Sequence, residues 1–473
     1  DSAGNALASA YTHSTGFTTS STPDTTAPSI SSSSPADSDT SVALDSTIAL
    51  TFSEAMDTTS VSTNTSGTTC SGTLQVSSDS FSTCVQMSAS PSISNSNKTF
   101  KVTPFSNLSR NTTYKIRLTT GVKDSEANPL SSQWTTNSGY TTSWTILFGT
   151  PHDENATDVT TDSSGNVYLT GWTEGELDGN SNSGLHDLFV VKYNSSGMKQ
   201  WTRQMGTSTE DKAMGIATDS SDNVYVTGWT GANLDGNTGA GDRDLFVVKY
   251  NSSGTKQWTK QLGTSSYDYA KGVATDSSDN IYLVGSTRGG IDGNSNADPG
   301  KSDFFIVKYN SSGTKQWTRQ LGTPRDEYIT GVATDSSGNA YATGYTEGDF
   351  DGNNNTGDKD IFIVKYNSSG TKQWSTLFGT SSDDFSNAIT IDNTSNIYVA
   401  GTKLYKYNSS GNSLWSASQT GNSLTTDSSG NIYLVDGLHF IKFNSSGDEL
   451  WSKNIGVNAR SLAIDFSGFI YLT

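Results

Sequence analysis

Four acidic segments of this chain carry oxygen side chains at spacings that suit a hard metal ion. They read ELDGNSNSGLHD, NLDGNTGAGDRD, GIDGNSNADPGKSD and DFDGNNNTGDKD, and each contains an Asp-Gly-Asn triplet and ends in aspartate. Ca²⁺ takes about six to eight oxygen ligands, and a D-x-N-x-N run lets a tight loop converge several of them. The sequence therefore indicates Ca²⁺ as the one candidate cofactor, with these candidate ligands: Asp178, Asn180, Asn182, Asp187, Asp235, Asn237, Asp244, Asp292, Asn294, Asn296, Asp303, Asp351, Asn353, Asn355 and Asp360.

The same segments are also explained by local backbone geometry, without a metal. Asp-Gly-Asn is a common turn former. Gly239 stands where the second segment needs a third oxygen side chain, and none of the four segments ends in the bidentate glutamate of an EF-hand loop. The sequence favours a plain turn over a calcium site and is compatible with both.

Residues for enzyme chemistry are scarce. The four histidines occupy non-equivalent positions, and no Ser/His/Asp or zinc-type cluster can be assembled from the spacing. Acidic pairs such as Asp153/Glu154 and Asp326/Glu327 could serve a glycosidase, which needs two carboxylates about 5 to 9.5 Å apart. A repeated, solvated acidic loop explains these pairs without catalysis. The sequence predicts a protein that is not an enzyme, with a glycosidase or lyase as the least favoured alternative.

The charge balance limits the partners. The chain has 29 Lys and Arg against 47 Asp and Glu, a formal net charge of −18 at pH 7. Such a surface repels phosphate backbones and anionic lipid headgroups. No run of about 18 apolar residues occurs. We therefore expect no nucleic-acid partner and no membrane insertion in this segment.

The elements that hold the acidic segments recur along the chain. Seven tryptophans return at spacings of 57, 57, 59, 57, 41 and 36 residues, namely Trp144, Trp201, Trp258, Trp317, Trp374, Trp415 and Trp451. In step with them, turns such as DSSGN begin at Asp162, Asp219, Asp276, Asp335, Asp392, Asp427 and Asp465. A repeat of this length with short alternating strands and Gly-rich turns is typical of a four-stranded propeller blade. Seven such units predict an all-β, seven-bladed β-propeller over residues 143–473.

The predicted order of strands places the loops on two faces. The tight turns DSSGN and YNSSG fall on one side, which we call the turn face. The four acidic segments and the connections between blades fall on the other, which we call the loop face, and the fifth and sixth units lack the inserts. In KYNSSGTKQWT, YNSSG forms a hairpin turn, and the following tryptophan fills the wedge between neighbouring blades. The repetition therefore reflects packing.

Residues 26–142 lack the repeat and contain the short strands TIALTFS, GTLQVSS, TFKVTPF and TYKIRLTT. A β-sandwich of about 110 residues fits this pattern. Cys70 and Cys84, the only cysteines, both lie here, and an even pair in an exported-looking chain favours a disulfide over two free thiols. Asp1–Thr19 aligns without gaps to residues 124–142, with nine of 19 positions identical. We therefore expect residues 1–25 to be the last strand of a preceding domain of this kind plus a linker, within a longer chain.

Both parts resemble known families. TDSSGNVYLTGWT and DLFVVKYNSSG, with the tryptophan that follows, resemble the bacterial seven-bladed β-propeller repeat proteins with SBBP-type repeats, over residues 142–473. ALTFSEAMD together with LSRNTTYKIRLTTGVKDSEANPL resembles the Ig-like domain of bacterial S-layer and other surface proteins. The resemblance implies export to the cell surface or the extracellular space. For function it implies little, because the propeller fold hosts many activities.

We expect a structural or adhesion protein with a propeller head on an Ig-like stalk. Its partners would be a protein or glycan at the loop face, or copies of itself in a surface assembly. The alternative is a carbohydrate-binding, lectin-type propeller that uses aromatic side chains near the loop face, such as Trp172, Trp229 and Tyr345.

Overall fold

The computed structural model describes residues 24–473 except 41, 111 and 144–147. The chain forms two compact units, Asp1–Ile146 and Leu147–Thr473. The described residues are mostly strands and loops, and their only helices are three short 3₁₀ turns, η1 (Leu177–Gly179), η2 (Leu234–Gly236) and η3 (Ile291–Gly293). None of these helices could cross a membrane.

The first unit is a sandwich of two antiparallel sheets, as predicted. One sheet has the order β1 (Ile30–Ser34), β2 (Ile48–Phe52), β5 (Thr99–Val102) and β4 (Ser92–Ser94). The other has the order β3 (Leu74–Ser77), β6 (Thr113–Leu118) and β7 (Trp134–Thr135), with β8 (Tyr140–Thr141) also paired to β6. Alternate residues of β2 and β6 point into one core, where Phe52 meets Phe100 edge to face at 5.8 Å. Period-two apolar patterning therefore builds the Ig-like unit.

The predicted disulfide is confirmed. Cys70 and Cys84 are bonded in the Ig-like unit, and Cys84 is buried. The bond closes a loop with a sequence separation of 14 residues. A loop of this size contributes roughly 3 kcal/mol of stability by restricting the unfolded chain.

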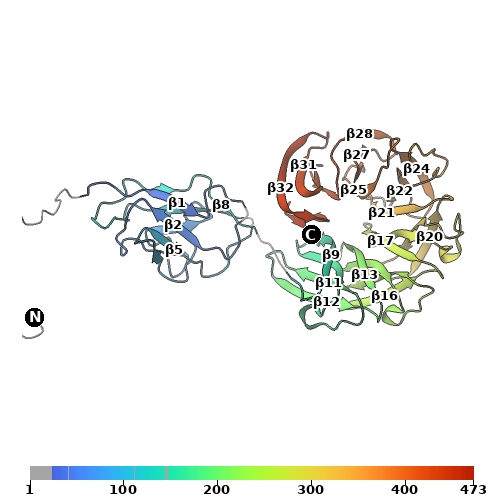
Figure 1. Cartoon of the computed structure of the whole chain (residues 1–473), viewed down its shortest axis with the longest axis horizontal. Helices are drawn as coiled ribbons and strands as arrows, with labels where there is room; N and C mark the ends of the chain where they lie inside the picture. Colours follow the sequence, from blue (N-terminus) through green and yellow to red (C-terminus); the bar gives the residue numbers. More distant parts are fainter. Residues whose placement is uncertain (1–23, 41, 111, 144–147) are drawn as a thin grey trace, which may run out of the picture. The chain divides into compact units, whose positions relative to one another are not determined.

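The described residues of the second unit form a propeller of six four-stranded antiparallel sheets and one two-stranded sheet. Figure 1 shows the sheets arranged around a centre, with β9, β13, β17, β21 and β25 on the inside. From inside to outside, blade one comprises β9 (Glu154–Thr161), β10 (Val167–Thr173), β11 (Asp187–Tyr193) and β12 (Lys199–Met205), and blade two comprises β13 (Asp211–Thr218), β14 (Val224–Thr230), β15 (Asp244–Tyr250) and β16 (Lys256–Leu262). In the same order, blade three comprises β17 (Asp268–Thr275), β18 (Ile281–Thr287), β19 (Asp303–Tyr309) and β20 (Lys315–Leu321), and blade four comprises β21 (Glu327–Thr334), β22 (Ala340–Thr346), β23 (Asp360–Tyr366) and β24 (Lys372–Phe378). Blade five comprises β25 (Ser386–Ile391), β26 (Ile397–Gly401), β27 (Leu404–Tyr407) and β28 (Ser413–Ala417), and blade six comprises β29 (Ser423–Thr426), β30 (Ile432–Val435), β31 (Gly437–Phe443) and β32 (Glu449–Ala459).

The ring of inner strands closes through the two-stranded sheet of β33 (Leu462–Ile464) and β34 (Ile470–Leu472). β33 lies against both β29 and β9. The Thr161 hydroxyl donates to the Ile464 carbonyl oxygen at 3.1 Å, and the Ser461 hydroxyl donates to Asp158 at 2.6 Å. These bonds join the last described strands to the first blade. The outer strand expected at Trp144 lies outside the described residues, so the number of seven blades stays a prediction.

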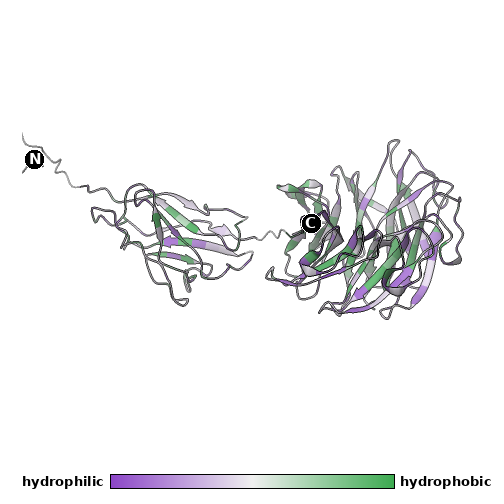
Figure 2. Ribbon diagram, turned by 60° about the horizontal axis from the view of Figure 1, so that its bottom comes forward, coloured by the Kyte–Doolittle hydropathy of each residue, from purple (hydrophilic) through white to green (hydrophobic). Residues whose placement is uncertain are grey.

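Blade packing explains the composition of the strands. The third strands β11, β15 and β19 are buried at every residue, because each middle strand is covered on both faces by neighbouring blades. Figure 2 shows hydrophobic residues concentrated in strands of the propeller. The indole N–H of Trp201 donates at 3.2 Å to the Ser252 carbonyl oxygen in the YNSSG turn of the next blade. Gly254 of that turn has φ +77°, and a Cβ there would lie 2.7 Å from the Trp201 ring. The repeated KYNSSGTKQW segment is thus an inter-blade contact.

Candidate functional site on the loop face

Each Asp-Gly-Asn triplet on the loop face is a tight turn. In η1, Asp178 has φ 51° and Gly179 has φ 78°, both in the left-handed region. The Asn180 amide donates to the Leu177 carbonyl oxygen at 2.7 Å, and the Leu177 side chain is buried beneath the turn. The other three triplets repeat this arrangement at Asp235, Asp292 and Asp351.

The first aspartate of each inserted segment is held by the outer strand of its own blade. The carboxylate of Asp178 accepts hydrogen bonds from the Lys199 ammonium and the Thr202 hydroxyl. Asp235 pairs in the same way with Lys256 and Thr259, Asp292 with Lys315 and Thr318, and Asp351 with Lys372 and Ser375. A lysine ammonium therefore already neutralises the first aspartate of each of the four segments.

The asparagines of these segments also bond within their own loops. The side-chain oxygen of Asn182 accepts from the Gly184 N–H at 2.9 Å, and the side-chain oxygen of Asn355 accepts from the Gly357 N–H at 2.9 Å. Asn296 bonds its own loop too, through the Asp298 N–H. The structure thus does not gather the predicted ligands of one segment around one point. Calcium binding by these segments stays a prediction.

The last aspartate of each segment lies apart from the first and is buried. One oxygen of Asp187 accepts from the Ser183 N–H at 2.9 Å and from the Gln204 amide at 3.2 Å. Asp244 bonds equivalently to Ala240 and Gln261. These carboxylates anchor the end of the insert and face the next blade.

A row of aromatic rings and cations crosses the loop face from blade one to blade three. We call it the aromatic–cation row, and it comprises Trp172, Lys212, Trp229, Arg243, Tyr267, Tyr269 and Arg288. The Lys212 ammonium lies 4.6 Å from the Trp172 ring centroid and 5.7 Å from that of Trp229. The His186 ring meets Trp172 edge to face at 4.6 Å. Lys212 therefore bridges the end of β10 to the end of β14.

Arg243 forms the centre of the row. Its guanidinium lies 4.2 Å from the Trp229 ring centroid and 5.6 Å from those of both Tyr267 and Tyr269. It donates to the Tyr269 hydroxyl at 2.9 Å and to the Glu210 carboxylate at 3.1 Å. Each such cation–π contact contributes about 0.5 to 2 kcal/mol, more where water is excluded. The inserted segment of blade two thus supplies the cation that fixes aromatic residues of blades two and three.

Arg288 ends the row and is exposed. Its guanidinium lies 5.5 Å from the Tyr267 ring centroid, and its Nε donates to the Ser302 hydroxyl at 3.5 Å. Among the described residues, its guanidinium has no carboxylate within ion-pair distance. Arg288 is therefore a positioned cation with donor capacity left for another molecule.

The aromatic residues proposed for sugar binding have different surroundings. Trp229 is 8% exposed, with Arg243 over its face, and Trp172 is covered by Lys212. Tyr345 stacks at 5.1 Å on Tyr328, which is 37% exposed. The sequence analysis did not identify Tyr328 as a candidate. The only signal for it in the sequence is its position directly after Glu327, the acidic residue at which β21 begins.

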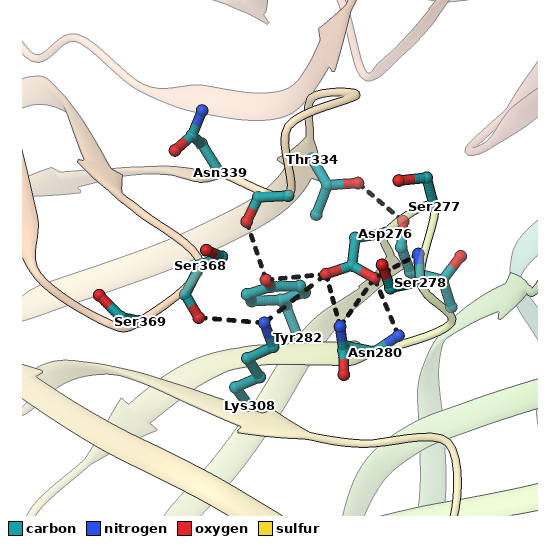
Figure 3. Close-up of polar contacts among 12 residues, drawn as sticks. Asp276, Ser277, Ser278, Asn280, Tyr282, Lys308, Thr334, Asn339, Ser368 and Ser369 are labelled. Carbon is teal, nitrogen blue, oxygen red and sulfur yellow. Dashed lines mark hydrogen bonds and ion pairs between the residues drawn. The ribbon is translucent and has the colours of Figure 1, made fainter.

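The turn face carries a depression of about 420 Å³ between blades three and four. Figure 3 shows Lys308 between Asp276 and Ser368. Its ammonium donates to the Ser368 carbonyl oxygen at 3.0 Å and lies 3.6 Å from Asp276, which also accepts from the Tyr282 hydroxyl at 3.0 Å. The same lysine-to-serine bond recurs at Lys192, Lys249, Lys365 and Lys406. Because it repeats at every one of these junctions, we interpret it as a structural contact.

These features define a β-propeller unit preceded by an Ig-like unit, and two family models match them. Residues 24–150 match the bacterial Ig-like domain. Residues 143–178, 200–235, 257–297, 316–351 and 373–402 match the beta-propeller repeat. The chain therefore carries a bacterial Ig-like domain followed by five matched beta-propeller repeats.

Two relatives are similar over part of the chain. The uncharacterized WD repeat-containing protein L264 of Acanthamoeba polyphaga mimivirus is 26% identical over 227 residues, which cover 38% of this chain and 16% of that protein. The regulatory protein FlaEY of Caulobacter vibrioides is 23% identical over 196 residues, which cover 37% of this chain and 20% of that protein. The matched regions thus span a fifth or less of either relative.

Among solved structures, BamB from Moraxella catarrhalis gives a TM-score of 0.37 at 14% identity, over 67% of this chain and 80% of that one. A protein of unknown function from Bacteroides caccae gives 0.37 at 11% identity, over 60% and 96%. Raptor from Chaetomium thermophilum gives 0.44 at 7% identity, over 69% and 28%.

Proposed function

We propose that this chain belongs to an exported, non-enzymatic bacterial surface protein whose propeller binds a partner through the loop face. Export is supported by the bacterial Ig-like domain and by the Cys70–Cys84 bond, because disulfides persist in oxidising compartments. The partner is a protein, a glycan or a second copy of the chain. The binding of this partner serves a structural or adhesive function.

The aromatic–cation row carries this proposal. Aromatic residues and arginine are enriched at the centres of protein interfaces, where rigid rings supply contact area. Arg243 and Arg288 are both oriented against Tyr267, so little side-chain freedom is lost when they contact a partner. The row crosses three blades on the side where the loops are longest, which is where repeat propellers vary without disturbing their packing.

The burial of Glu327, the acid with a strongly raised pKa, supports a role without catalysis. Burial raises the pKa of Glu327 to about 7, which would suit a general acid or base at neutral pH. However, Glu327 is 0% exposed, and its oxygens accept bonds from Thr323 and Thr346. It therefore cannot touch a substrate.

Paired variants test the proposal. The whole chain would be screened on a glycan array, and its self-association measured by analytical ultracentrifugation. We expect binding or association that the double substitution Arg243→Ala, Arg288→Ala abolishes. Lys453→Ala is the matched control, because Lys453 is also an exposed cation beside a ring, 5.8 Å from the Trp451 centroid, in a blade without an insert. Equal loss in both variants would contradict a site on the loop face.

Glycan binding is the candidate that one further observation favours. Tyr328 is exposed and stacked on Tyr345, which in turn meets Phe385 edge to face at 4.9 Å. A fixed, exposed ring offers a face on which a sugar can pack. A glycan ligand lost in Tyr328→Ala and kept in Lys453→Ala would support the lectin-type role. Glycan binding that is retained in both variants would contradict the lectin-type role.

A further inference from the structure

The junctions between blades bring two acidic residues side by side. The Asp211 N–H donates to the His186 carbonyl oxygen at 2.8 Å, and His186 and Glu210 form a parallel bridge. The next residues along each segment, Asp187 and Asp211, are therefore neighbours from different blades. The following junction repeats this geometry, because the Asp268 N–H donates to the Arg243 carbonyl oxygen at 2.9 Å and Asp244 lies beside Asp268.

Each of these four carboxylates has one oxygen without a partner. Asp187, Asp211 and Asp268 are 0% exposed and Asp244 is 1% exposed. The Oδ2 atoms accept hydrogen bonds, Asp187 from Ser183 and Gln204 and Asp211 from Thr207, with equivalent bonds at Asp244 and Asp268. All four Oδ1 atoms are buried with no hydrogen-bond partner. A buried carboxylate oxygen left unpaired is costly, so two adjacent unpaired oxygens at one junction favour a positive partner between them.

Glycine makes room for two of the unpaired oxygens themselves, which lie where a Cβ would otherwise stand. A Cβ on Gly206 would lie 2.1 Å from Asp187 Oδ1, and a Cβ on Gly263 would lie 2.0 Å from Asp244 Oδ1. The Thr230 and Thr287 hydroxyls donate to the Ala232 and Gly289 carbonyl oxygens at 3.1 Å, and each also lies close enough to Asp211 or Asp268 to act against the rise in its pKa. Asp211 and Asp268 therefore have one hydroxyl nearby, whereas Oδ1 of Asp187 and of Asp244 lies against glycine without a hydrogen-bond donor.

The charges at these junctions are also unbalanced. Burial raises the pKa of Asp187 and of Asp211, and the charge of Asp187 adds to the shift of Asp211. Burial acts in the same direction on Asp268, with a contribution from Asp244. Within the described ranges, the ion pairs of the chain's lysines, arginines and histidines do not include these four acids. Two adjacent buried carboxylates without a basic neighbour favour either a bound cation or a shared proton.

We propose that a hard divalent cation, Ca²⁺, binds at two blade junctions, bridging Asp187 to Asp211 and Asp244 to Asp268. Carboxylate oxygens are preferred Ca²⁺ ligands, with backbone carbonyls and water completing the shell of about six to eight. Each ion would tie the end of an inserted segment to the next blade. The site differs from the Asp-Gly-Asn turns, whose carboxylates are paired with lysine, and it does not depend on the proposed partner.

At the third blade junction Asp303 lies beside Glu327, and at the fourth Asp360 lies beside Asp384. Hydrogen bonds at Glu327 and Asp384 exclude both junctions as calcium sites. Both oxygens of Glu327 accept from threonines, and Asp384 Oδ1 accepts from the Thr402 hydroxyl at 2.9 Å. These junctions have one unpaired oxygen each, on Asp303 and Asp360. The expected stoichiometry is therefore two ions for each chain.

Equilibrium dialysis of the whole chain against ⁴⁵Ca²⁺, after treatment with EDTA, tests the proposal. We expect two ions bound at saturation, one in Asp211→Asn, one in Asp268→Asn and none in the double variant. Asp178→Asn, the matched control in the Asp-Gly-Asn turn, keeps two. Circular dichroism confirms that each variant is folded. If the variants do not fold, the wild-type protein still tests the idea, because Ca²⁺ should raise its melting temperature and EDTA should lower it.

Three results would overturn the assignment. The absence of bound Ca²⁺ at about 1 mM free ion, the upper end of the dissociation constants of extracellular calcium modules, would contradict a calcium site. Loss of an ion in Asp178→Asn but not in Asp211→Asn would move the metal to the turn. Stability that responds to pH but not to Ca²⁺ would show that the acids share a proton instead.

Discussion

Glu327 offers a sharp test of how burial and hydrogen bonding compete in this propeller. Its pKa is raised from 4.5 to about 7, with burial as the largest cause and bonds from Thr323 and Thr346 acting against it. Because the folded-state pKa exceeds the unfolded one, the folded protein binds the proton more tightly. Stability is therefore greatest below about pH 4.5 and falls as the pH rises to about 7, where the loss levels off.

The size of the expected change in stability follows from the pKa shift of Glu327. A difference of about 2.5 pKa units corresponds to about 3 kcal/mol, as an upper value. Glu327→Gln removes this titration while keeping the size of the side chain. We expect urea unfolding, followed by tryptophan fluorescence, to show a smaller loss of stability between pH 5 and pH 8 in the variant than in the wild type, by up to about 3 kcal/mol.

Glu154 in blade one is the matched control. It accepts the same three bonds, from the Thr150 N–H, the Thr150 hydroxyl and the Thr173 hydroxyl. Burial raises its pKa too, but the hydrogen bonds outweigh burial and leave the pKa below its ordinary value. Glu154→Gln should therefore remove stability that is present above about pH 4.5 and lost at lower pH. If the wild type and Glu327→Gln lost stability in parallel between pH 5 and pH 8, the reasoning about Glu327 would be refuted.

Three further substitutions test the packing. Cys70→Ser, which leaves Cys84 unpaired, should cost the Ig-like unit about 3 kcal/mol in denaturant unfolding, and no change would deny the bond a stabilising role. Trp317→Ala should cost the propeller about 3 kcal/mol by calorimetry, because the ring and its bond to the next blade are both lost. Gly206→Ala should cost about 1 to 3 kcal/mol, since its Cβ would overlap Asp187, and an unchanged melting temperature would contradict that overlap.

Much of the fold could be predicted because its signals are local. The turn at Asp162 is closed by bonds to Ser164 and Asn166, within four residues, so DSSGN specifies a hairpin wherever it occurs. Alternation in VYLTG and DLFVVKY marks strands, and the order of these elements repeats with each tryptophan. Seven repeats of one pattern then indicate a propeller, because a single blade cannot bury its own faces.

The candidate sites depended on contacts that the sequence does not encode locally. Asp178 and Lys199 are 21 residues apart, and net charge alone could not indicate which cation would neutralise which acid. Asp187 and Asp211 come from different blades and meet only because the sheets stack with a fixed offset. Thus local hydrogen bonding and period-two patterning let the sequence determine the strands and turns. The partners of buried charges were decided by the tertiary structure, since they depend on how rigid blades pack against one another.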